Sequence, residues 1–138
     1  MMEVSIRNEA DLTNPTTITI CDTCKRQGWN EKNRAETDGA VFASLIEMAA
    51  RTVPGLRTRR HSCLMGCDWG CNLSITAKDK LTYVLGNFKP ETEAATAVVE
   101  YARLHAESET GQVPFRSWPQ AVKGHFTARL PVPNDDSE

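Results

Sequence analysis

The sequence predicts one α/β domain with a mixed four-stranded sheet, flanking helices and an extended C-terminal tail. The chain has 138 residues, which is enough to bury one hydrophobic core but not two. Apolar residues make up 40% of it and charged residues 25%, as in ordinary globular domains. Segments that favour strands alternate with segments of helical periodicity, and this alternation is typical of α/β folds.

The first strand is predicted over residues 16–20, after a polar lead-in over residues 1–15. Every residue of this strand is Thr or Ile, and a β-branched run favours an extended chain. A helix is predicted over residues 39–52, with Asp38 as its N-cap. Its apolar residues recur at helical spacing and define one buried face: Val41, Leu45, Ile46, Ala49 and Val53.

A second strand is expected over residues 56–62, after Pro54 and Gly55 end the helix. Residues 72–77 and 81–85 are two further strands, which a polar turn joins into a hairpin. Pro90 suits the first position of a second helix. The buried face of that helix consists of small and β-branched residues, namely Ala95, Val98, Val99 and Ala102.

The domain proper is expected over residues 16–106. Residues 107–138 are rich in proline and are predicted to form an extended tail with three aromatic anchors, Phe115, Trp118 and Phe126. Within the domain, a strand–helix–strand unit implies two parallel strands with a right-handed crossover, and the hairpin adds antiparallel strands. This arrangement is thioredoxin-like.

Charge and hydropathy argue against two classes of partner. Sixteen Lys and Arg against eighteen Asp and Glu give a formal net charge of −2, so the composition favours neither nucleic acid nor an anionic membrane. The longest apolar stretch is interrupted by Ser44 and Glu47, so no transmembrane helix is expected. The chain begins without a secretory signal, which favours a cytoplasmic location.

Five cysteines are the most informative feature of the chain. In a reducing cytoplasm, thiols are kept for metal binding or catalysis rather than for structural disulfides. Cys21 and Cys24 follow the first strand, whereas Cys63, Cys67 and Cys71 precede the third. Because loops at neighbouring strand ends can converge, this distribution predicts a metal site with thiolate ligands.

The spacing favours an iron–sulfur cluster over zinc. Structural zinc sites prefer two C-x2-C pairs, and only Cys21 and Cys24 have that spacing. Iron–sulfur clusters accept less regular spacings, because their ligands bind different irons. A zinc or cobalt carrier that uses the same cysteines is the alternative, and inorganic sulfide content distinguishes the two.

Residues between and before the second group of cysteines are candidates for supporting a cluster. The backbone amides at Gly66 and Gly70 can donate to sulfur, and Trp69 can shield the site from water. The basic run over residues 57–61 can offset cluster charge. An exposed strand and simple packing of Trp69 explain the same residues equally well.

The motif Cys63-Leu64-Met65-Gly66-Cys67 resembles the ligand loop of thioredoxin-like [2Fe-2S] ferredoxins. That resemblance implies that Cys21, Cys24, Cys63 and Cys67 hold the cluster. The first pair is spaced more closely than in those ferredoxins, and Cys71 stands near a position where they carry proline. Cys71 is therefore an alternative or exchangeable ligand.

The motifs CDTC, CLMGCDWGC and YVLGNF also resemble a family of predicted metal-binding proteins found near cobalamin-synthesis genes. This resemblance implies a role beside cobalt or corrin chemistry, with a cobalamin-pathway enzyme as a candidate partner.

A thiol–disulfide oxidoreductase that uses Cys21 and Cys24 is a second alternative. Its attacking thiol needs a depressed pKa, and the predicted helix begins too far along the chain to provide one. The three histidines, His61, His105 and His125, are scattered and suggest no catalytic site. We therefore expect a one-electron carrier with an unidentified redox partner rather than an enzyme, and homodimerisation stays open.

Overall fold

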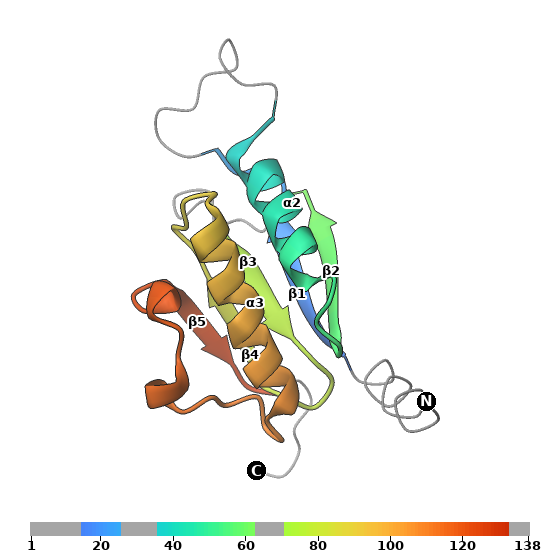
Figure 1. Ribbon diagram of the computed structural model, residues 1–138. Helices are drawn as coiled ribbons and strands as arrows, with labels where there is room; N and C mark the ends of the chain where they lie inside the picture. Colours follow the sequence, from blue (N-terminus) through green and yellow to red (C-terminus); the bar gives the residue numbers. More distant parts are fainter. Residues whose placement is uncertain (1–14, 26–35, 63–70, 133–138) are drawn as a thin grey trace, which may run out of the picture.

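The computed structural model describes residues 15–25, 36–62 and 71–132. In these residues the chain forms a mixed sheet of five strands, in the order β2-β1-β3-β4-β5, and two α-helices, α2 and α3 (Figure 1). The bounds of the strands are Thr16–Cys21 for β1, Leu56–His61 for β2, Leu73–Thr76 for β3, Thr82–Leu85 for β4 and Phe126–Leu130 for β5.

Strand β1 lies inside the sheet and organises it. It pairs in parallel with β2 and antiparallel with β3, which in turn forms an antiparallel hairpin with β4. The predicted parallel pair and the predicted hairpin are therefore confirmed. Helix α2, Asp38–Ala50, connects β1 to β2, and helix α3, Thr92–Glu107, follows β4.

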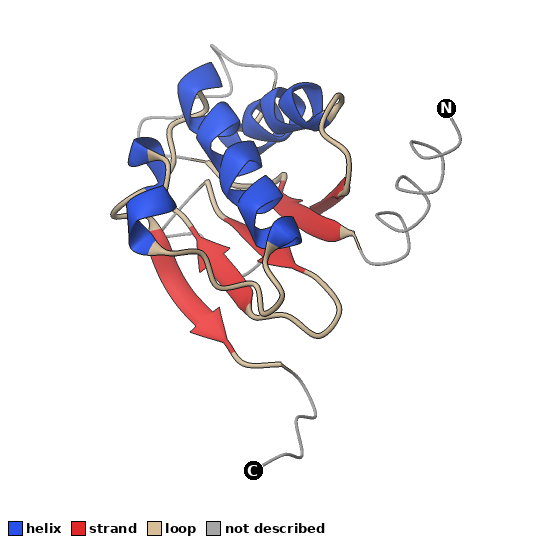
Figure 2. Ribbon diagram, turned by 60° about the horizontal axis from the view of Figure 1, so that its bottom comes forward, coloured by secondary structure: helices blue, strands red, loops and turns tan. Residues whose placement is uncertain are grey.

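Both helices pack on the same face of the sheet, where the apolar core lies (Figure 2). The strands and helices contribute fully buried side chains to this core, among them Ile18, Ile20, Leu73, Ile75, Phe42, Ile46, Val98 and Tyr101. In the described parts of the chain no helix covers the opposite face of the sheet. None of the described helices is long and apolar enough to cross a membrane.

The two helices begin at residues that differ from the prediction. The N-cap of α2 is Thr37, whose side-chain oxygen accepts a hydrogen bond from the Ala40 amide at 3.0 Å. Asp38 is instead buried in the first turn, so its prediction as N-cap was wrong by one residue. Helix α3 has Glu91 as its N-cap, which places Pro90 outside the helix.

The prediction of four strands was wrong, and the described part of the predicted tail, residues 107–132, is not extended throughout. Residues Phe126–Leu130 form β5, which pairs antiparallel with β4 and makes the sheet five-stranded. The connection from α3 forms two short 3-10 helices, η2 at Phe115–Ser117 and η3 at Gln120–Val122. Aromatic packing explains this folding, because the Trp118 and Phe126 ring centroids lie 4.5 Å apart and both rings contact Tyr101 of α3.

His105 joins α3 to the sheet as a buried, neutral imidazole. Its Nε2 lies 2.7 Å from the Leu81 carbonyl oxygen, and its Nδ1 lies 2.9 Å from the Thr16 hydroxyl oxygen. A carbonyl can only accept, so Nε2–H donates to it and Nδ1 accepts from Thr16. Burial lowers the pKa of His105. Its two hydrogen bonds link α3 to the sheet, so this side chain stabilises the fold.

Candidate metal centre

Three cysteines from two distant parts of the sequence lie at one end of the sheet. Cys21 is the last residue of β1, Cys24 follows in the next loop, and Cys71 lies just before β3. All three side chains are buried, with at most 2% of their surface exposed. The pairing of β1 with β3 brings the two segments together, since the Cys21 amide donates to the Asn72 carbonyl at 3.1 Å.

Groups around the Cys24 sulfur shift the pKa of its thiol in opposite directions. Burial raises the pKa of the Cys24 thiol to about 12, and the nearby thiols of Cys21 and Cys71 act in the same direction. A backbone hydrogen bond from Asn72 to the sulfur lowers that pKa, but only in part. The Cys24 thiol therefore stays protonated at neutral pH unless a cation stabilises its thiolate.

Asn72 is the principal polar contact of this thiol. The Cys24 thiol donates to the Asn72 side-chain oxygen at 3.2 Å, and Asn72 itself is buried. An amide side chain can present either its oxygen or its NH2 group, so the same residue can accept from a thiol or donate to a thiolate. Sequence reasoning missed Asn72, although its position directly after Cys71 was an available signal.

The N-terminus of α2 packs directly against the Cys21–Cys24 loop. The Gly39 amide donates to the Cys24 carbonyl at 2.9 Å, and the Thr37 hydroxyl donates to the Asp22 carbonyl. A Cβ atom at position 39 would lie 2.1 Å from the Cys21 carbonyl oxygen, so only glycine fits there. The helix was expected to begin too far along the chain to depress a cysteine pKa. Its N-terminus does reach the loop, but the Gly39 amide donates to a carbonyl oxygen and the pKa of Cys24 is raised, not depressed.

The Asp22 side chain is a further unusual feature of this loop. Its Oδ1 atom is buried and has no hydrogen-bond partner among the described residues. Its backbone is fixed, because the Asp22 amide donates to the His61 carbonyl at 3.1 Å. Buried acceptors are normally satisfied, and the described residues supply no donor to this oxygen.

Cys71 is held from its other side by Phe88. Two backbone hydrogen bonds link these residues, with lengths of 3.3 and 3.4 Å. The Phe88 ring stacks on His125 at a centroid distance of 4.2 Å and lines a pocket of about 380 Å3. Cys71 is thus fixed to β1 through its neighbour Asn72 and to the segment after β4 through Phe88.

The structure tests only part of the predicted ligand set. Cys63 and Cys67 lie outside the described residues, as do the candidate supporting residues Gly66, Trp69 and Gly70. Within the described residues, no three His, Cys, Asp or Glu side chains are placed to hold a metal ion. The quartet of Cys21, Cys24, Cys63 and Cys67 therefore stays a prediction.

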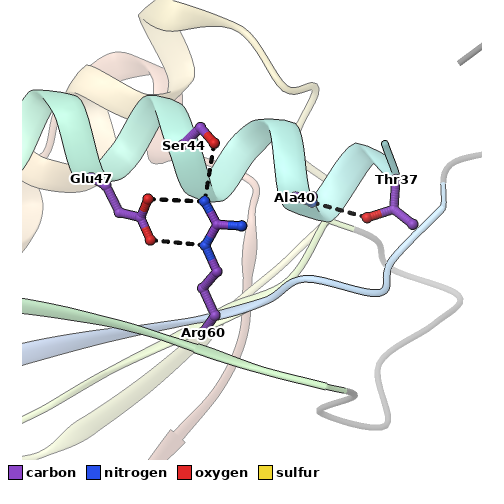
Figure 3. A network of polar contacts seen from close by, with 5 residues as sticks. All are labelled: Thr37, Ala40, Ser44, Glu47 and Arg60. Carbon is purple, nitrogen blue, oxygen red and sulfur yellow. Dashed lines mark hydrogen bonds and ion pairs between the residues drawn. The ribbon is translucent and has the colours of Figure 1, made fainter. Parts of the chain in front are cut away.

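The basic run before the second cysteine group lies on an exposed edge strand. Arg60 of β2 reaches over to α2, where it forms an ion pair with Glu47 at 2.9 Å and donates to Ser44 at 3.0 Å (Figure 3). The side chains of Arg57, Arg59 and His61 are exposed. The basic run was interpreted either as a source of charge beside a cluster or as an exposed, solvated strand. Its geometry favours the solvated strand.

A comparison with protein families matches residues 18–132 to a protein of unknown function, DUF1636. The chain belongs to the DUF1636 family. The matched region includes all five cysteines and the fifth strand, so the family domain extends past the helix at which the predicted domain ended. No curated protein and no solved structure matches the chain.

Proposed function

We propose that this DUF1636 protein is a thioredoxin-like iron–sulfur protein that binds one [2Fe-2S] cluster and carries single electrons. The observation that carries the proposal is the burial of Cys21, Cys24 and Cys71 together at one end of β1 and β3. These three described cysteines are free thiols, and soft thiolates are the ligands that such clusters need.

The sheet supports the thioredoxin-like part of the proposal. Its core contains a parallel β1–β2 pair joined through β3 to an antiparallel hairpin, with α2 and α3 on one face. This is the arrangement expected of a thioredoxin-like domain, and β5 is an addition at its edge. The loops after β1 and before β3 are the positions where the related ferredoxins carry their ligands.

The proposed ligands are Cys21, Cys24, Cys63 and Cys67, with Cys71 as an alternative. The position of Cys71 supports it as a ligand, because its thiol is close enough to raise the pKa of Cys24. When bound, the cluster supplies a centre that accepts and releases one electron. The chain contributes burial, which keeps water from the sulfurs, and the Asn72 amide, which hydrogen-bonds to one of them.

Two other functions use the same residues. A zinc or cobalt carrier needs the same thiolates and differs from the cluster protein by its lack of inorganic sulfide. A thiol–disulfide oxidoreductase that uses Cys21 and Cys24 is the other function, and the α2 N-terminus packs beside Cys24 through a hydrogen bond to its carbonyl oxygen. The burial of both sulfurs and the raised pKa of Cys24 oppose that function, since a reactive thiol is accessible and acidic.

The partner of the proposed carrier is a redox protein, and a cobalamin-pathway enzyme is one candidate. The nature of the bound group is testable first, by metal and acid-labile sulfide analysis of the protein purified without oxygen. Equal amounts of iron and sulfide would support the cluster. Stoichiometric zinc without sulfide, even after reconstitution with iron and sulfide, would replace the proposal with the carrier alternative.

A further inference from the structure

The segment that follows α3 builds a second pocket, whose lining includes none of the buried cysteines. The pocket has a volume of about 470 Å3, which is within the usual range for small-molecule sites. It lies where the connection from α3 meets β4 and β5. Four of its lining residues are aromatic, namely Tyr83, Phe115, Trp118 and Phe126.

The four rings are packed into a rigid group. The centroids of Phe115 and Trp118 lie 4.9 Å apart, and those of Tyr83 and Phe126 lie 5.7 Å apart. The Trp118 indole donates its N–H to the Val113 carbonyl at 2.8 Å, which fixes the ring and uses its only donor. A ligand therefore meets aromatic surface here rather than an indole hydrogen-bond donor.

Part of this aromatic surface faces solvent. Phe115 has 63% of its surface exposed, and it is one of the few large apolar side chains in the described chain that are this exposed. The removal of such a ring from water favours association, and its flat shape favours a flat partner. Because η2 holds Phe115 in place, its exposure follows from the fold rather than from a loose chain end.

The charge at this pocket is positive. Arg129 of β5 lines it, no Asp or Glu is among its lining residues, and Arg129 forms no salt bridge with a described acidic residue. The Lys123 ammonium, which is not among the lining residues, lies 4.6 Å from the centre of the Phe115 ring. A guanidinium without an acidic partner is suited to a carboxylate, sulfonate or phosphate group.

We propose that this pocket binds a small planar aromatic molecule that carries an anionic group. The aromatic part packs against Phe115 and its neighbouring rings, and the anion contacts the Arg129 guanidinium. This site is independent of the cysteine site, so its ligand does not depend on whether the protein holds a cluster.

Two fluorescent probes that differ in one group test the proposal. 8-Anilinonaphthalene-1-sulfonate carries an anion, whereas N-phenyl-1-naphthylamine has the same rings without it. We expect saturable binding of both probes to the folded full chain. Arg129→Gln should raise the dissociation constant of the sulfonate about threefold and leave that of the neutral probe unchanged. Arg116→Gln, an exposed cation on η2 outside the pocket lining, is the matched control.

Phe115→Ala should raise the dissociation constants of both probes about fivefold. Phe115→Leu keeps an apolar side chain without the ring and should also weaken the binding of both probes. A loss in both variants is then due to the missing ring and not to a local packing defect. Circular dichroism and the melting temperature establish that each variant is folded. Unchanged binding of both probes in the two Phe115 variants would overturn the site, and an equal effect of Arg129→Gln on both probes would overturn the anionic part.

Discussion

Gly39 provides the most direct test of how the α2 N-terminus and the cysteine loop depend on each other. In Gly39→Ala the new Cβ would lie 2.1 Å from the Cys21 carbonyl oxygen and 3.1 Å from the Cys24 nitrogen. The neighbouring atom is backbone rather than a flexible side chain, so the helix and the loop must separate by about 1 Å. Overpacking of this kind usually costs about 1–3 kcal/mol of stability.

We therefore expect Gly39→Ala to lower the free energy of unfolding by about 2 kcal/mol, measured by urea denaturation. Because the shift moves the residues between Cys21 and Cys24, the variant should also assemble less of the proposed cluster on reconstitution with iron and sulfide. Ala40→Gly is a matched control, since it weakens the same helix turn by up to about 1 kcal/mol without a new contact. Unchanged stability in Gly39→Ala would show that the close approach of Gly39 to the Cys21 carbonyl is not tight.

Three further predictions concern the buried histidine, the surface ion pair and the predicted ligands. Burial lowers the pKa of His105, so the unfolded chain binds more protons below about pH 6.5 and stability should fall as the pH falls from 7.5 to 5.5. His105→Gln should show a smaller fall in urea denaturation, and an equal fall would contradict this. Arg60→Ala should lower the free energy of unfolding by less than about 1 kcal/mol in thermal denaturation, because Arg60 and Glu47 are both more than a third exposed. A larger loss would contradict this. Cys63→Ser should abolish cluster assembly and Cys71→Ala should retain it, as judged by the visible spectrum, and loss in the latter would place Cys71 among the ligands.

The sequence predicted the strands and helices whose patterns are local. The β-branched run of β1 and the periodicity of α2 and α3 each identify an element without reference to the rest of the chain. The parallel pairing of β1 with β2 then follows from chain connectivity. These elements also place Cys21, Cys24 and Cys71 at one end of the sheet.

The sequence did not predict the features that depend on tertiary contacts. Strand β5 has no regular alternation of apolar and polar residues, and it is held by pairing with β4 and by the rings of Tyr101 in α3 and of Trp118, which follows η2. The contact of Gly39 with the Cys21 carbonyl joins residues that only the folded chain brings together. Asn72 was missed for the same reason, because its role depends on a thiol that is distant in sequence.

The proposed [2Fe-2S] cluster takes up one electron per chain. The most direct test is an anaerobic reductive titration of the purified full chain, followed by electron paramagnetic resonance. We expect a silent oxidised protein that gives a half-integer spin signal of about one spin per chain after uptake of one electron. A protein that takes up no electron and stays silent after reconstitution with iron and sulfide would contradict it.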